Sequence, residues 1–175
     1  MRKVIVVLFV ATLLIMSTTV GVFAAADPSV TVVSPGASVT GNSLLISIKM
    51  TAPKTIKVFV YEEKLKSGNQ LKSIDPLNTN VDKVNPDDIR SVSIIKPLTY
   101  KNTSSLKFFN KKIENVGEGL YRICVATLDA KGNIVATSNV RAVMLSKSTS
   151  ATDIFQDNGG LLKWVQNFIK NIFRS

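Results

Sequence analysis

The side chains that could carry chemistry in this chain are few, and most of them are acids. The 175 residues include no histidine, which excludes Ser-His-Asp and Cys-His catalysis and the usual zinc sites. Half of the acids lie in one polar stretch: Glu62, Glu63, Asp75, Asp82, Asp87 and Asp88. Two carboxylates at a suitable separation can hydrolyse a glycosidic bond, but the spacing of these acids selects no such pair.

The same acids do not form a recognisable metal site. A calcium loop needs alternating oxygen ligands around a central glycine, and this stretch has no such pattern. The chain also lacks a Gly-rich motif that would cradle a phosphate. We therefore predict a protein that is not an enzyme, with no catalytic residue, no metal site and no cofactor.

Cys124 is the single cysteine of the chain, so no disulfide can form within it. No basic side chain with a suitable spacing is available to activate its thiol. We expect a buried apolar thiol, with a disulfide between two chains as the alternative. The fold must then depend on its hydrophobic core.

Residues 1–26 have the three-part pattern of a secretory signal peptide. They begin with the basic pair Arg2 and Lys3, continue with an apolar run over residues 4–16, and end in alanines at 24–26. The alternative is an uncleaved membrane anchor, because the segment is long enough to span a bilayer. We expect a secreted or extracellular protein, including one associated with the cell envelope, and the lack of disulfides suggests a bacterial source.

Residues 27–146 show the period-two alternation of apolar and polar side chains that is typical of half-buried strands. Seven strands are expected, at 30–33, 44–50, 56–61, 92–95, 106–113, 120–126 and 134–145. Residues 62–90 form a long polar insertion, either a recognition loop or a disordered connection. Within it, Asn85-Pro86-Asp87-Asp88 predicts a single helical turn with an asparagine cap. The pattern as a whole predicts an all-β antiparallel sandwich.

The segment 116–141 carries the clearest fold signal. It contains Gly117-Glu118-Gly119-Leu120-Tyr121-Arg122-Ile123 and, after it, the hairpin turn Asp129-Ala130-Lys131-Gly132-Asn133. Gly132 can supply the positive φ that such a turn requires. Two adjoining antiparallel strands are therefore expected on either side of this turn.

This hairpin resembles the sixth strand and final hairpin of immunoglobulin-like and fibronectin type III-like domains. In that family a tyrosine, two residues before an inward cysteine position, bonds its hydroxyl back to the preceding corner. The resemblance places Tyr121 at the tyrosine and Ile123 at the cysteine position, as a structural tyrosine corner. The chain lacks the antibody disulfide, so it is similar to the disulfide-free Ig-like modules of bacterial secreted and surface proteins. The resemblance covers roughly residues 29–146 and implies architecture, not activity.

After a polar linker at 147–160, residues 161–175 are predicted to form an amphipathic helix. Its apolar face consists of Leu161, Leu162, Trp164, Val165, Phe168, Ile169, Ile172 and Phe173, and its polar face carries Lys163, Lys170 and Arg174. A helix of fourteen residues is about 21 Å long, too short to span a membrane. Its apolar face must be buried against another surface. Three surfaces are possible: a membrane interface, a groove of another chain or copy, and the sandwich itself over Phe59 and Tyr61.

We therefore expect a non-enzymatic binding or assembly module in which an Ig-like scaffold is attached through its C-terminal helix. The attachment residues are Leu161, Lys163, Trp164, Val165, Phe168, Ile169, Lys170, Ile172, Phe173 and Arg174. The partner is a membrane surface or a protein. Because the formal net charge is +10, an anionic cell-wall polymer or polysaccharide is a further candidate, whereas nucleic acid is not expected after export. The alternatives are a carbohydrate-binding accessory domain that uses Tyr61 and Tyr100, and a secreted inhibitor or chaperone of an enzyme.

Overall fold

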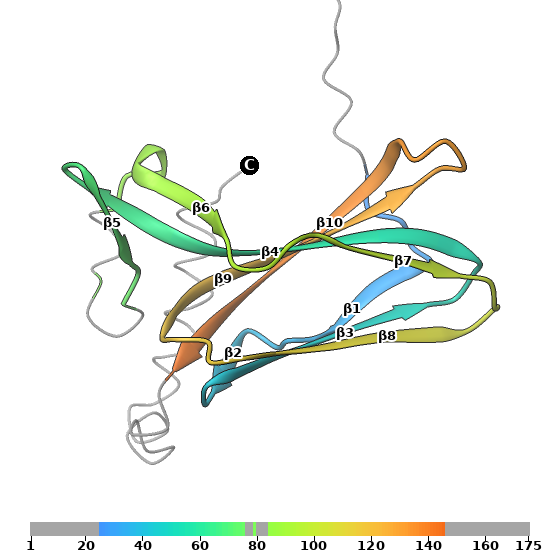
Figure 1. Ribbon diagram of the computed structural model, residues 1–175, viewed down its shortest axis with the longest axis horizontal. Helices are drawn as coiled ribbons and strands as arrows, with labels where there is room; N and C mark the ends of the chain where they lie inside the picture. Colours follow the sequence, from blue (N-terminus) through green and yellow to red (C-terminus); the bar gives the residue numbers. More distant parts are fainter. Residues whose placement is uncertain (1–24, 76–78, 80–83, 146–175) are drawn as a thin grey trace, which may run out of the picture.

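The computed structural model describes residues 25–75, 79 and 84–145, and these form two β-sheets packed face to face (Figure 1). Most of the predicted signal peptide, the linker 147–160 and the helix 161–175 lie outside the described residues. Within those ranges the chain has ten strands and one short 3-10 helix.

The smaller sheet has three strands in the order β1-β3-β8, all antiparallel. Their bounds are β1 (Val30–Ser34), β3 (Ser43–Met50) and β8 (Lys107–Glu114). Along β3 the residues Leu44, Ile46, Ile48 and Met50 are fully buried, while the residues between them face outward. This alternation is what the pleat of a strand requires when one face of its sheet is covered.

The larger sheet has seven strands, with β4 at its centre. Their bounds are β2 (Ser38–Thr40), β4 (Lys54–Ser67), β5 (Gln70–Ser73), β6 (Ile89–Ser93), β7 (Leu98–Asn102), β9 (Gly119–Leu128) and β10 (Ile134–Leu145). The long β4 strand pairs with β9 and then β5 along one edge, and with β7 and then β6 along the other. The pairings are antiparallel except that β2 runs parallel to β10.

This connectivity defines an Ig-like sandwich. The first two strands belong to different sheets: β1 joins the smaller sheet, and β2 pairs with β10 in the larger one. The strands β3 and β8 face β4, β9 and β10, as the second and fifth strands of an immunoglobulin domain face the third, sixth and seventh. In the described residues no strand pairs with the outer edge of β8, because β7 joins β4 instead. The predicted all-β Ig-like class is confirmed.

The core lies between the two sheets and takes residues from both. Its buried members are Val30, Leu44, Ile46, Ile48, Met50, Ile56, Val58, Val60, Val116, Tyr121, Ile123, Val125 and Met144. Burying one such aliphatic side chain stabilises the fold by about 1.5–3 kcal/mol. A core of this size can hold a disulfide-free domain together.

The strand count differs from the seven predicted. The strands β2, β5 and β7 were not expected, and β4 continues to Ser67, well into the segment predicted as an insertion. The three residues of β2 are too few to show a period, and all four residues of β5 are exposed. The described part of residues 62–90 is therefore mostly sheet. The predicted helical turn is present as η2 (Pro86–Asp88), with the Asn85 side chain accepting from the Asp87 amide at 3.1 Å.

The hairpin between β9 and β10 turns at Asp129. Its Oδ1 atom accepts from the backbone N–H groups of Lys131 and Asn133, both at 2.8 Å, and Gly132 has φ 87°. Hydrogen bonds from Asn133 lower the pKa of the Asp129 carboxyl below its usual value, although slight desolvation acts in the opposite direction. The ionised carboxylate thus holds the predicted turn closed.

An Asp129→Ala variant should lose stability at neutral pH and lose much less in acid. Because the folded pKa is lowered, the contribution is present above the unfolded pKa and disappears as pH falls through the folded value, below about pH 4. Urea unfolding of both proteins at pH 7 and in acid measures this. Asp88→Ala, in the exposed η2 turn, is the control. A deficit of the Asp129 variant that is the same at every pH would contradict the prediction.

Candidate functional site

The tyrosine corner is a structural contact inside the sandwich. Tyr121 lies on β9, faces the core, and donates its hydroxyl to the carbonyl oxygen of Gly117 at 3.0 Å. Burial, followed by the charge of Glu62, raises the pKa of Tyr121 to about 12, so the phenol stays protonated. Ile123, two residues further on, is fully buried. Both side chains are therefore committed to the fold and offer no reactive group to a ligand.

The polar side chains that gather in one place lie on the opposite face of β4 and β9, away from the smaller sheet. Residues that alternate with the core-facing Val58 and Val60 must point outward, and the strand register places Tyr61 beside Arg122 and Phe59 beside Cys124. We call the following set the outer-face cluster. It consists of Phe59, Tyr61 and Glu63 from β4, Ser91 from β6, Arg122 from β9 and Asn139 from β10.

The centre of the outer-face cluster is an ion pair between Glu63 and Arg122. The Arg122 Nε atom lies 2.5 Å from the Glu63 Oε1 atom, and its Nη2 atom donates to the Ser91 hydroxyl at 2.8 Å. That hydroxyl in turn donates to the second Glu63 oxygen at 2.8 Å, while Arg122 Nη1 reaches Asn139 at 3.3 Å. Glu63 is only 2% exposed, so its charge depends on this closed network.

The aromatic members of the cluster stack beside this pair. The Phe59 and Tyr61 rings are nearly parallel, with centroids 6.3 Å apart. The Arg122 guanidinium lies 4.7 Å from the Tyr61 centroid, and the Lys57 ammonium lies 5.6 Å from that of Phe59. Such cation–π contacts hold cations and rings in a fixed row. The rings and the arginine are thus already engaged with one another.

The two tyrosines offered for carbohydrate binding do not come together. Tyr61 is on the outer face beneath Arg122, whereas Tyr100 on β7 packs toward the core, with its ring 5.4 Å from that of Phe109. A sugar-stacking surface needs exposed ring faces on one side of the protein. The arrangement of these two residues therefore gives the carbohydrate alternative no support.

The acids and the cysteine are also dispersed. Glu62 accepts from the Ser73 hydroxyl at 2.5 Å and pairs with Lys64 at 3.1 Å, and Asp82 lies outside the described residues. Desolvation raises the pKa of the half-buried Cys124 thiol, although Arg122 lowers it, so the thiol is protonated at neutral pH. Among the described residues no group of three or more His, Cys, Asp or Glu side chains could hold a metal ion.

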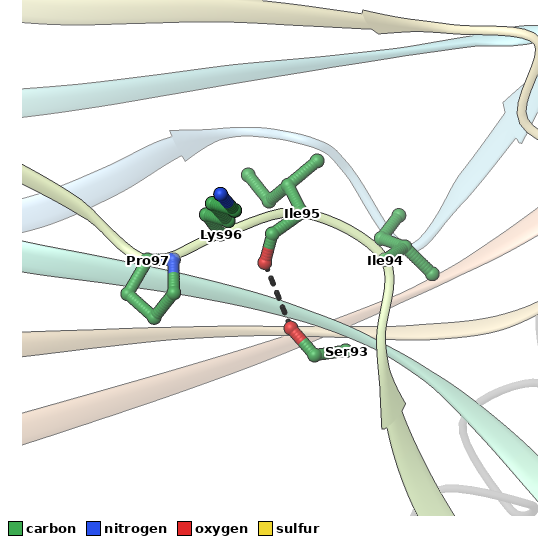
Figure 2. A pocket seen from close by; sticks show the side chains of 5 residues that line it. All are labelled: Ser93, Ile94, Ile95, Lys96 and Pro97. Carbon is green, nitrogen blue, oxygen red and sulfur yellow. Dashed lines mark hydrogen bonds between the residues drawn. The ribbon is translucent and has the colours of Figure 1, made fainter.

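One surface hollow, of about 380 Å³, lies where the chain passes from β6 to β7 (Figure 2). Five consecutive residues line it: Ser93, Ile94, Ile95, Lys96 and Pro97. The Ser93 hydroxyl donates to the Ile95 carbonyl oxygen at 2.8 Å, which shapes the bend. Lys96 is the only ionisable side chain in the lining, so the hollow provides no acid–base pair.

Sequence reasoning missed the ion pair at the centre of the cluster. It placed Glu63 in a long polar insertion, whereas the residue is buried in β4. Because side chains alternate along β9, Arg122 lies on the face opposite Tyr121 and Ile123, but only the strand register brings it to Glu63. The predicted attachment residues between 161 and 175 lie outside the described residues. Within the described part of the chain, no helix is long and apolar enough to cross a membrane.

No protein-family model matches this chain, and no curated protein matches it. The solved structures that match include the CARDB domain of a Pyrococcus furiosus protein, in complex with di-metal ions. It is 14% identical, with a TM-score of 0.37, and the match covers 71% of this chain and 98% of that one. The class 5 fimbriae chaperone CfaA is 11% identical, with a TM-score of 0.38 and coverage of 66% and 54%. The Salmonella enterica SafA pilin–SafB chaperone complex is 9% identical, with a TM-score of 0.34 and coverage of 72% and 59%. At these scores the fold assignment depends on the strand topology itself.

A Glu63→Gln variant should lose about 1–3 kcal/mol of unfolding free energy, because it leaves the Arg122 charge without its carboxylate in a mostly buried network. Urea denaturation measures the loss. Glu114→Gln is the matched control, since it removes the pair between exposed Lys112 and Glu114, which should change stability far less because both partners are in water. Equal losses in the two variants would contradict a stabilising role for the buried pair.

A Tyr121→Phe variant should keep the packing of the ring and lose only the bond to Gly117, at a cost of about 1 kcal/mol. The cost stays moderate because Gly117 is exposed and its carbonyl can bind water. Tyr100→Phe, which keeps the ring contact with Phe109, serves as the control in the same denaturation series. If the Tyr121 variant is as stable as the control, the hydrogen bond from Tyr121 to Gly117 does not stabilise this domain.

Proposed function

We propose that this protein is an exported, non-enzymatic binding or assembly module of a bacterial cell envelope. In this proposal the Ig-like sandwich is the rigid scaffold, and residues 161–175 attach it to a membrane surface or a protein partner. The observation that carries the proposal is the composition of residues 161–175, whose spacing predicts a helix with one apolar face and a basic polar face. Among the described residues, the core of the scaffold lies between its two sheets.

The composition of the terminal segment supports attachment. Its spacing predicts eight large apolar side chains on one helical face, and its three charged residues, Lys163, Lys170 and Arg174, are all positive. A basic amphipathic helix of this kind binds best at an interface between apolar and anionic groups. In this proposal these side chains bind a surface outside the sandwich interior.

The sandwich contributes a second set of basic side chains. The edge strand β8 of the smaller sheet carries Lys107, Lys111 and Lys112, all exposed. Lysines on an edge strand discourage further strand pairing, which keeps such a module from aggregating. They also favour contact with an anionic polymer or lipid surface. The chemistry of both basic elements thus points to an acidic envelope component.

Co-sedimentation with vesicles of phosphatidylglycerol and phosphatidylcholine tests the attachment. The chain from residue 27 to 175 should pellet with these vesicles, and the same chain ending at residue 160 should stay in solution. Phe168→Asp should release the full chain because it places a charge in the apolar face, whereas Asn167→Asp, on the polar face, should have a smaller effect. Binding should weaken with salt, since part of it is electrostatic.

Two results separate the possible attachment partners. Release from vesicles by truncation supports the membrane surface. Retention in envelope fractions but not on lipid vesicles, lost on truncation, supports a protein partner. If Phe168→Asp and truncation leave both kinds of partitioning unchanged, the attachment role of the terminal segment is refuted.

A further inference from the structure

A second group of buried apolar side chains lies outside the core of the sandwich. Ile74, Leu120, Val143 and Leu145 are 0%, 1%, 1% and 2% exposed, respectively, yet none belongs to the core cluster between the sheets. We call these four residues the outer patch. Side chains buried to this degree require a cover on every side.

The strand register places the outer patch on the outer face of the larger sheet. Leu120 and Val143 are direct partners in β9 and β10, and each is followed by a residue that faces the core, Tyr121 and Met144. Because side chains alternate along a strand, Leu120 and Val143 point to the opposite face. Leu145, two residues beyond Val143, shares its side.

Ile74 joins the patch from the end of β5. The Ile74 carbonyl oxygen would lie 3.9 Å from a Cβ atom on Gly119, the first residue of β9. Ser73 pairs with Lys64, so Ile74 continues along the edge of β4 next to Glu63. Glu63 is itself a direct partner of Leu120 and is buried. The patch and the buried ion pair therefore occupy one continuous region.

The described residues provide no layer over this region. Their elements are the strands of the two sheets and the short η2 turn, none of whose residues is buried, and the smaller sheet packs on the opposite face. At the other end of β10, Ile134 and Val135 have no cover and are both 53% exposed. The cover over the patch is therefore not found among the described residues.

Only one remaining segment has the right composition and position. Residues 146–175 continue directly from Leu145, a member of the patch. The 15 residues from 146 to 160 can span about 50 Å when extended, more than enough for residues 161–175 to return to the sheet. Residues 76–78 and 80–83 contain only Leu77 and Val81 as large aliphatic side chains. Residues 1–24 belong to the expected signal peptide.

We propose that residues 161–175 form a helix that docks its apolar face onto the outer patch of the same chain. The docked helix covers Leu120, Val143 and Leu145 and keeps water from the Glu63–Arg122 pair. This docking describes the protein free in solution and goes beyond the proposed attachment. Because one apolar face cannot serve two surfaces at once, attachment to a membrane requires the helix to leave the sheet.

The only tryptophan of the chain, Trp164, reports this docking directly. In vesicle-free buffer its fluorescence should be blue-shifted and protected from acrylamide. Val143→Asn should shift the emission to the red and increase quenching severalfold. Val135→Asn makes the same substitution on the same strand at an exposed site and should leave the spectrum unchanged. Weaker docking should also strengthen vesicle binding by the Val143 variant.

A second pair of variants leaves the sandwich untouched and decides the case if Val143→Asn does not fold. Phe168→Asp should expose Trp164, and Asn167→Asp should not. Full accessibility of Trp164 in the unchanged protein, or equal spectra within each pair of variants, overturns the docking. A protection that appears only as protein concentration rises assigns the helix to a second copy and also overturns it.

The results distinguish this inference from the attachment proposal. Trp164 protected in buffer, with no binding to vesicles or envelope fractions, supports docking and refutes attachment. Trp164 exposed in buffer and protected only after vesicles are added refutes docking and supports attachment. If Trp164 is protected in buffer and the protein also binds vesicles with Trp164 protected there, both docking and attachment are supported.

Discussion

The pairing of β4 with β9 is the constraint on which the rest of the structure depends. Its register sets Val60 opposite Ile123, both in the core, and Tyr61 opposite Arg122, both on the outer face. A slip of one residue would exchange the two faces of the strand, burying arginine and exposing isoleucine. The same ladder fixes the distance from Arg122 to Glu63 and brings the tyrosine corner to the end of the core.

The two faces of the larger sheet use different interactions. The inner face is mainly apolar, with Thr127 buried opposite Ile56, and it is stabilised by packing against the smaller sheet. The outer face combines a buried ion pair, stacked aromatic rings and the outer patch. A buried pair contributes little net stability by itself, but losing one partner is costly, so such a pair makes one arrangement of the face strongly preferred. Burial on both faces is unusual for an antiparallel sandwich, in which the outer face is commonly solvated.

The reactive side chains make contacts that hold the sandwich together. A ligand would therefore meet the surface of the domain and not a set of free reactive groups. Arg122 uses all three nitrogen atoms of its guanidinium group within the domain, and the Cys124 thiol is kept protonated by partial burial. Glu62 and Glu63 face opposite sides of β4 and bind different partners. A domain built in this way can present a surface and hold it still, which is what a binding or assembly module needs.

The sequence by itself determined the strands whose alternation depends only on neighbours along the chain, such as 44–50, 56–61 and 120–126. It also determined the Asp129 turn and the single turn after Asn85, because the side chains that close them lie within four residues. Only the tertiary structure decided the strands β2, β5 and β7, which are short and are defined by their pairing with β10 or β4. It likewise decided the burial of Glu63 and the inward direction of Tyr100. Residues far apart in the chain create these environments, so the local alternation of apolar and polar residues cannot predict them.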